Sequence, residues 1–135
     1  GPAAIAAVAE DYAEMVSALS TLGGQLTATV HAGEGDEAMV RDLVPLLEEI
    51  AGRVILNGYP TGVEVCSSMQ HGGPYPASTD SRFTSVGTGA ITRWVRPVAY
   101  QGFPQNMLPE ELRDENPRHI QRLVDGQPES RLEMA

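Results

Sequence analysis

The sequence contains one residue that could act as a covalent nucleophile, the single cysteine Cys66. A thiolate can attack an aldehyde or acyl carbon when its surroundings are partly exposed and electropositive. No base or helix N-terminus is evident in the neighbouring sequence, and free cysteine is often simply a small apolar side chain. We therefore favour a structural, pocket-lining role for Cys66 and keep a nucleophilic role as the alternative.

The three histidines do not form a metal-binding pattern, since His31, His71 and His119 belong to no HxH, HxxxH or Cys/His cluster. His71 stands directly before Gly72-Gly73, where backbone can approach a ligand closely and an imidazole can line a cavity. Ordinary loop packing explains His71 equally well. Glu64, a lone loop carboxylate, is more often a solvated turn residue than a general base.

The glycines do not match either phosphate-binding motif, because neither GxGxxG nor GxxxxGK[ST] occurs. We expect no dinucleotide to be held by these residues. The 18 acidic and 9 basic residues give a formal net charge of -9, which disfavours nucleic acid as a partner. No apolar run is long enough for a membrane helix. A single cysteine cannot form an internal disulfide, so nothing argues for an oxidising compartment and we expect a cytoplasmic protein by default.

The elements that must position these residues alternate along the first part of the chain. Residues 3–9 read as a strand, 12–22 as an amphipathic helix, 26–30 as a strand, 37–50 as a helix capped by Asp36, and 54–56 as a buried strand. Pro45 predicts a kink or break in the second helix. This βαβαβ order over residues 1–57 predicts an α/β fold, with a partial parallel sheet and crossover helices.

A glycine- and proline-rich loop follows from Asn57 to Arg82, and we assign residues 58–83 to it as a separate segment. Loops of that length are commonly functional. Within residues 84–135 we expect a weak helix capped by Ser85, a short edge strand that begins at Val98 and ends at Tyr100, and a polar tail with one short helix at 109–113.

One region carries a family resemblance: residues 52–100, GRVILNGYPTGVEVCSSMQHGGPYPASTDSRFTSVGTGAITRWVRPVAY. It resembles the end of the catalytic domain in the aldehyde dehydrogenase superfamily. The strings NGYPTGVEV, HGGPYPAS and TSVG are most similar to the branch of 2-oxoglutarate semialdehyde (2,5-dioxopentanoate) dehydrogenases and NADP-dependent fatty aldehyde dehydrogenases. GQLTATV and LPEELRDENP extend the resemblance in both directions, so the chain is identified as a C-terminal fragment.

The resemblance implies which parts of such an enzyme the chain lacks. Gly1-Pro2 matches the end of the family's Glu-x-Phe-Gly-Pro motif better than it matches an expression scar. The catalytic cysteine, the general-base glutamate, the oxyanion asparagine and the Rossmann motif precede this region in the family. We therefore expect the fragment to be inactive alone and to bind no cofactor, whereas the intact enzyme uses NADP or NAD.

The resemblance also implies a substrate-binding role for the long loop. Thr61, Gly62 and Val63 match a segment of the pocket wall, and His71 takes the position of a pocket-lining phenylalanine. In the intact oxidoreductase a thiolate attacks the semialdehyde or aldehyde, hydride passes to the nicotinamide, and water releases the acid. The implied partners are the remainder of the dehydrogenase chain and further copies, joined as a homo-oligomer through the strand at residues 98–100.

A non-enzymatic alternative remains at this stage. The chain could fold on its own as an oligomerisation or binding module that uses the loop or an exposed sheet edge. The residues do not determine the physiological aldehyde, the choice between NAD and NADP, or whether the truncation is natural, proteolytic or engineered.

Overall fold

The computed structural model describes residues 1–129. These residues belong to two compact units, Gly1–Arg96 and Pro97–Ala135, which are described separately. The first unit has the order α1, β1, α2, β2 and a 3₁₀ helix, η1, whereas the second has two 3₁₀ helices and a two-stranded hairpin.

The chain begins with an extended segment that forms no strand. Residues 1–9 have no regular structure, and the side chains of Ile5 and Val8 are 99% and 94% exposed. The prediction of a strand at residues 3–9 is therefore wrong for this structure. A strand is stabilised by pairing with a neighbour, and none of residues 10–129 pairs with this segment.

Helix α1, Tyr12–Ser20, forms where the apolar spacing predicted it. Asp11 caps it, since its Oδ1 accepts the Glu14 N–H at 2.8 Å. None of the residues of α1 is buried, although the helix contacts α2. The helix is thus fixed mainly by its own cap and hydrogen bonds.

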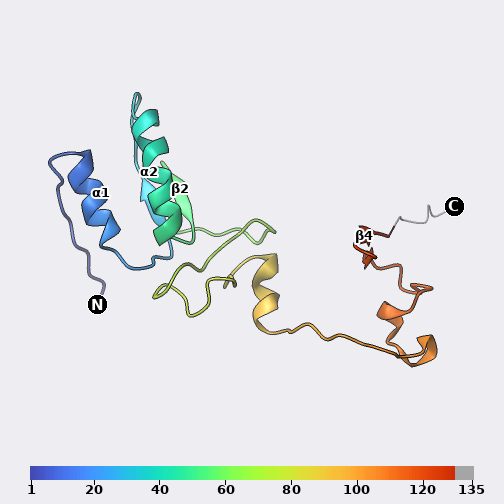
Figure 1. Ribbon diagram of the computed structural model, residues 1–135. Coiled ribbons are helices and arrows are strands. Elements are labelled where there is room, and N and C mark those ends of the chain that lie inside the picture. Colours follow the sequence, from blue (N-terminus) through green and yellow to red (C-terminus); the bar gives the residue numbers. More distant parts are fainter. Residues whose placement is uncertain (130–135) are drawn as a thin grey trace. The chain divides into compact units, whose positions relative to one another are not determined.

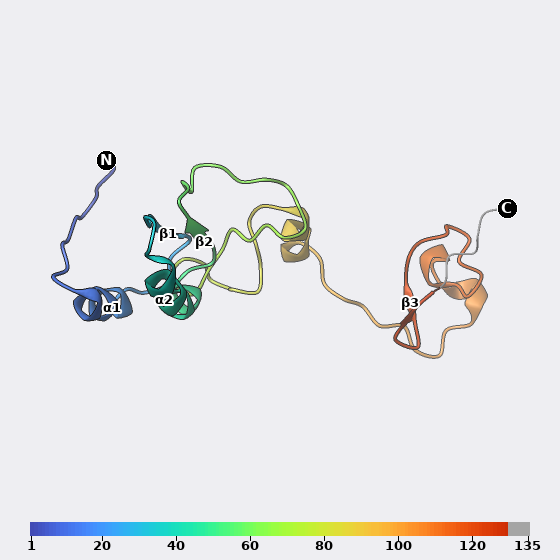
Figure 2. The ribbon, with the colours of Figure 1, turned by 90° about the horizontal axis from the view of Figure 1, so that it is seen from above.

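The core of the first unit is a βαβ unit, made of β1 (Ala28–Val30), α2 (Glu37–Ile50) and β2 (Val54–Leu56). The two strands pair in parallel, Ala28 opposite Val54, and α2 packs on the sheet as the crossover helix (Figures 1 and 2). The buried apolar side chains among the described residues are those of Leu43, Leu47 and Ala51. The predicted α/β class and parallel pairing are therefore confirmed.

Three details of this unit differ from the sequence predictions. Pro45 lies inside α2, which continues from Glu37 to Ile50, so the predicted break is absent, whereas a kink stays a prediction. Asp36 stands at the N-cap but makes no capping bond, because its Oδ2 accepts the Gly33 N–H at 2.9 Å instead. The strand β2 is not buried, since Val54 and Leu56 are 38% and 59% exposed. A two-stranded sheet with one crossover helix cannot cover both faces of its strands.

The long loop folds back on the start of both strands. Gly24 N–H donates to the Tyr75 carbonyl at 3.1 Å, and a Cβ at Gly52 would lie 2.2 Å from the Gly72 carbonyl oxygen. Gly73 has φ +147° and a Cβ there would lie 2.4 Å from the Gln25 carbonyl oxygen. Only glycine permits so close a crossing of main chains. The loop is therefore anchored at residues 72–75.

The weak helix predicted after Ser85 is present as the 3₁₀ helix η1, Thr88–Arg93. It begins after Gly87, whose φ is +99° and whose missing side chain leaves room for Met69 and the Cys66 carbonyl. Ser85 is not its cap, because the Ser85 hydroxyl donates to the His71 carbonyl. The start of the helix thus lies later than predicted.

The second unit contains η2 (Gln105–Met107), η3 (Glu110–Leu112) and a hairpin of β3 (Leu123–Val124) and β4 (Gln127–Pro128). The short helix expected at residues 109–113 is present as η3. Residues 98–100 form no strand, and Val98 and Tyr100 are 59% and 45% exposed. No strand among the described residues lies opposite them, so their peptide groups lack a pairing partner.

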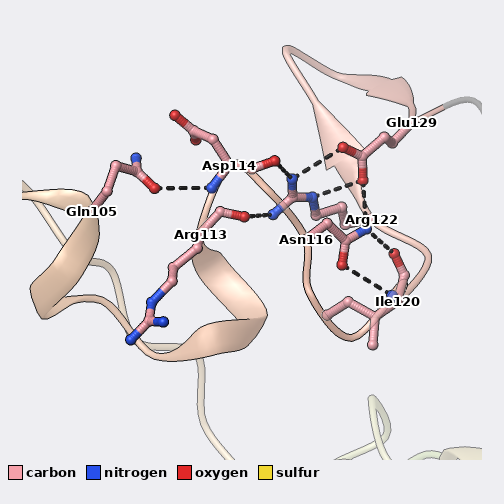
Figure 3. Close-up of polar contacts among 7 residues, drawn as sticks. All are labelled: Gln105, Arg113, Asp114, Asn116, Ile120, Arg122 and Glu129. Carbon is pink, nitrogen blue, oxygen red and sulfur yellow. Dashed lines mark hydrogen bonds and ion pairs between the residues drawn. The ribbon is translucent and has the colours of Figure 1, made fainter.

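Figure 3 shows how the hairpin is joined to the turns before it. The Arg122 guanidinium binds both oxygens of Glu129, with Nε at 2.8 Å from Oε2 and Nη2 at 3.0 Å from Oε1. The same guanidinium donates to the carbonyls of Arg113 and Asp114. Asn116 Nδ2 also donates to Glu129 Oε2, at 2.8 Å. One arginine thus links three segments of this unit.

Candidate functional site

The predicted pocket-wall segment is exposed and is held from one side by an arginine. Thr61, Gly62 and Val63 are all exposed. Arg53, which directly precedes β2, donates from Nη2 to the Pro60 carbonyl at 2.9 Å and from Nη1 to the Gly62 carbonyl at 3.1 Å. The two bonds bracket Thr61, so the segment has a defined backbone path although its side chains face solvent.

His71 is half-buried, and its main chain is fixed by the two residues after Phe83. Its N–H donates to Thr84 Oγ1 at 2.8 Å, and its carbonyl accepts from the Ser85 N–H at 2.9 Å and the Ser85 hydroxyl at 2.7 Å. Thr84, only 6% exposed, donates its own hydroxyl proton to the Val86 carbonyl at 2.6 Å. The backbone on either side of the imidazole is therefore rigid.

The imidazole of His71 lines a cavity of ≈ 120 Å³. Its Nδ1 is buried and has no hydrogen-bond partner among residues 1–129. Asp80 and Arg93 lie on the same cavity, but the Asp80 carboxylate is bound bidentately by Arg82, with Nη2 at 2.6 Å from Oδ2. The hydrogen bonds from Arg82 lower the pKa of Asp80 to about 2. The Asp80 carboxylate is therefore ionised at neutral pH, and Arg82 balances its charge.

Cys66 has the surroundings of a structural residue. Its thiol is half-buried and lies 3.3 Å from the Ser68 hydroxyl, and within residues 1–129 it has no histidine or carboxylate hydrogen-bond partner. The Cys66 carbonyl accepts from Thr88 N–H at 3.2 Å, which ties the loop to the start of η1. This geometry supplies no base for a nucleophilic thiol and favours the structural interpretation.

The structure does not unite the four predicted site residues in one pocket. His71 lines its cavity together with Gly72, Ser78, Thr79, Phe83 and other residues, whereas Thr61, Gly62 and Val63 are not among them. The residues that organise the loop, Arg53 and Thr84, were missed by sequence reasoning. Local spacing carried no signal for them, because the loop residues that they hold lie seven to thirteen positions away in the chain.

A second cavity, of ≈ 310 Å³, lies at the carboxyl ends of β1 and β2. It is lined by Ala32, Gly33, Glu37, Val40, Arg41, Leu56 and Asn57. The Asn57 side chain closes the two strand ends, because its Oδ1 accepts the Ala32 N–H at 2.8 Å and its Nδ2 donates to the Ala32 carbonyl at 3.1 Å. This edge is where parallel sheets usually present their ligand-facing groups.

The glycine pair Gly72-Gly73 serves the packing of the long loop. The spaces in which side chains would stand at Gly72 and Gly73 are filled by main-chain atoms of Phe83, Gln25 and Gly52, so these glycines pack the loop and present no phosphate cradle. Residues 1–129 also hold no group of three or more His, Cys, Asp or Glu side chains able to bind a metal. Among the same residues, no helix has the length and apolarity needed to cross a bilayer.

Comparison with known proteins identifies the family to which the chain is related. No family model matches the sequence. The chain is 54% identical over 126 residues to an alpha-ketoglutaric semialdehyde dehydrogenase of Acinetobacter baylyi, covering 93% of this chain and 24% of that protein. It is 50% identical over 129 residues to alpha-ketoglutaric semialdehyde dehydrogenase 2 of Azospirillum brasilense, covering 96% and 25%.

The chain thus spans about a quarter of the length of the curated relatives it matches. Identity of one residue in two over almost the whole chain confirms the resemblance that the loop motifs indicated. The two relatives bear semialdehyde dehydrogenase names, in keeping with the branch to which NGYPTGVEV and HGGPYPAS pointed. The chain is therefore a fragment of an aldehyde dehydrogenase.

Proposed function

We propose that this chain is the C-terminal portion of an NAD(P)-dependent dehydrogenase that oxidises a semialdehyde to its carboxylic acid. Within that enzyme the chain supplies the substrate-pocket wall, through Thr61, Gly62, Val63 and His71. The names of the two relatives support the substrate class. Aldehyde dehydrogenases generally use NAD(P), and the residues that hold it are expected in the remainder of the enzyme. A cytoplasmic location of the whole enzyme belongs to the same proposal.

The observation that carries the proposal is the anchoring of the long loop. A passive connection of this length would be held only at its ends, but this loop is fixed at three further places: by Arg53 at residues 60–62, by the glycine crossing at 72–75, and by Thr84 at His71. Between these anchors the side chains of Thr61 and Val63 remain exposed. Such rigid backbone with free side chains is suited to form one wall of a pocket.

The chain contributes no reacting group to the oxidation in this proposal. Cys66 has no adjacent base, and the glycine pair is occupied by protein backbone. The expected contribution is shape: the wall excludes water and orients the aldehyde for a nucleophile outside this chain. An isolated chain should therefore show no turnover.

Turnover by the isolated chain and by the whole dehydrogenase that contains it distinguishes this proposal from its rivals. Both are assayed at equal molarity with alpha-ketoglutaric semialdehyde and either NADP or NAD, and reduced cofactor is followed by absorbance. We expect reduction only with the whole enzyme. Cofactor reduction by a pure preparation of the isolated chain would refute the proposal, and so would inactivity of the whole, correctly assembled protein.

A binding or oligomerisation module is the second candidate, favoured by apolar side chains on the surface of the first unit. Trp94, Ile91 and Val95 are 77%, 60% and 60% exposed, and Ile5 and Val8 are almost fully exposed. Surfaces of this kind are usually covered by other protein. Light scattering of the isolated chain over a range of concentrations tests this candidate: a monomer at high concentration argues against it, and a defined oligomer supports it.

A further inference from the structure

Arg53 has a part in the pocket wall that no sequence motif assigns to it. It lies between Gly52, where the main chain crosses Gly72, and the first residue of β2. Its own carbonyl accepts the Ala28 N–H at 2.9 Å, which fixes its backbone to the first residue of β1. The side chain therefore projects from one of the most firmly held positions of the first unit.

The guanidinium of Arg53 grips two carbonyls that are separated by one residue. Nη2 lies 2.9 Å from the Pro60 oxygen and Nη1 lies 3.1 Å from the Gly62 oxygen, with Thr61 between them. Nη1 is also 3.8 Å from Met69 Sδ. A planar guanidinium offers donors in a fixed fork, which a lysine ammonium cannot reproduce. The fork thus sets both the position and the direction of the backbone at Thr61.

No other hydrogen bond within residues 1–129 reaches residues 58–63. The one further contact of note is a tilted stacking of the Tyr59 ring on His31, with centroids 5.4 Å apart. Thr61, Gly62 and Val63 are exposed and have no apolar cover to hold them. Without Arg53 the segment would be an untethered surface loop, whose conformations interconvert freely.

The arginine is not explained by stability alone. Its Nε is buried and unpartnered among the described residues, although the terminal nitrogens are bonded. A buried donor without an acceptor opposes folding. Arg53 therefore contributes more to holding the loop than to stabilising the core.

We infer that Arg53 is a positioning residue for the substrate: it holds residues 60–62 so that Thr61 and Val63 form a pocket wall of fixed shape. This inference rests on the proposed function of the loop. Loss of the fork should leave the chemistry of bound substrate nearly intact while the wall samples many positions. Substrate affinity should then fall more than the rate of the chemical step.

The test uses the whole dehydrogenase that contains this chain. Arg53→Met removes the fork and keeps an unbranched stem, Arg53→Lys keeps the charge, and Arg96→Met is the matched control, because Arg96 is exposed and forms no ion pair or side-chain hydrogen bond within residues 1–129. The rate at which thermolysin cuts the folded enzyme before Val63, followed by mass spectrometry, measures the tether directly. Steady-state kinetics with alpha-ketoglutaric semialdehyde measure its consequence for KM and kcat.

We expect Arg53→Met to raise both the rate of cleavage before Val63 and the KM roughly tenfold, with kcat changed by no more than about threefold, since two modest hydrogen bonds are lost. Arg53→Lys should lie between this variant and the wild type, and Arg96→Met should match the wild type. A merely structural role would lower the active fraction, and hence kcat, without moving KM.

Two results would overturn the inference: an unchanged cleavage rate in both Arg53 variants, or faster cleavage with an unchanged KM. If Arg53→Met does not fold, Arg53→Lys decides by the same two measurements. Failure of the proposed function has a different signature, because the wild-type whole protein would then not oxidise the semialdehyde at all. The cleavage measurement would still show whether Arg53 tethers residues 60–62.

Discussion

At the scale of single residues, the loop depends on side chains that satisfy buried backbone groups. Thr84 is 6% exposed, and its hydroxyl accepts from the His71 N–H and donates to the Val86 carbonyl. Valine has nearly the same shape as threonine but can form neither hydrogen bond. The effect of replacing Thr84 by valine should therefore come from the lost hydroxyl group and not from a change in side-chain volume.

Thr84→Val should destabilise the loop locally by about 1–3 kcal/mol, because it leaves a donor and an acceptor buried without partners. Amide hydrogen exchange at His71 measures this loss. Ser85→Ala is the control: Ser85 is exposed, and the His71 carbonyl keeps the Ser85 N–H when the hydroxyl is removed. Equal protection in Thr84→Val and the wild type would show that another group restrains His71.

Glu129 makes the second unit sensitive to acid. The hydrogen bonds from Arg122 lower the pKa of Glu129 below its ordinary value. Since the folded pKa lies below the unfolded one, the pair stabilises the fold at and above neutral pH. That contribution is lost as the pH falls below the ordinary glutamate pKa of about 4.3 and through the folded value.

We therefore expect hydrogen exchange in residues 122–128, corrected for intrinsic rates, to accelerate on acidification below about pH 4. Glu129→Gln should remove most of this pH dependence, whereas Glu115→Gln, a control at an exposed residue with no ion pair among the described residues, should retain it. An acid response that persists unchanged in Glu129→Gln would assign it to another carboxylate.

At the scale of elements, the sequence predicted those whose signals are local. The apolar stripes of α1 and α2 and the β-branched run of β1 each depend on near neighbours, and all three elements form. Residues 3–9 and 98–100 carry strand-like composition as well, but a strand needs a partner that composition cannot supply. Both stay unpaired.

The hairpin of β3 and β4 was missed although its turn signal was available. Asp125 and Gly126 both have positive φ, 52° and 77°, as the tight two-residue turn of a hairpin requires. An Asp-Gly pair is the usual sequence sign of such a turn, although here an apolar run, Leu123-Val124, lies only on one side of it. The proline-rich, polar character of the tail concealed it.

Pro45 offers a test of how α2 is stabilised. It is exposed in the middle of the helix and provides no N–H for the Arg41 carbonyl. Pro45→Ala should therefore stabilise the chain by about 1–3 kcal/mol, measured from the midpoint of urea unfolding. Pro109→Ala, before the first residue of η3, should change the midpoint little. A lower midpoint for Pro45→Ala would mean that the ring makes contacts that stabilise the helix.

At the scale of the whole molecule, the family and the fold class were accessible from the sequence, but the organisation of the site was not. The motifs around Thr61 and His71 identified the loop and its relatives. Arg53 and Thr84, which hold that loop, bind residues seven to thirteen positions away in the chain. Such contacts depend on where the glycine crossing places the loop, and no residue pattern encodes that.

The exposed strands and thin core have one explanation at this scale. The chain spans about a quarter of its relatives' length, and in the function proposed above the rest of the enzyme covers β2 and a further copy pairs with residues 98–100. In the same proposal the loop forms one wall of the substrate pocket.

A chimera tests this account most directly: this chain replaces the matching segment of the Acinetobacter baylyi alpha-ketoglutaric semialdehyde dehydrogenase, with which it is 54% identical. The measurement is kcat/KM for alpha-ketoglutaric semialdehyde, beside the unaltered enzyme. The account predicts a folded chimera that retains activity within about tenfold, since a wall of the same kind has been exchanged. A folded chimera of the same oligomeric state with no detectable turnover would contradict it.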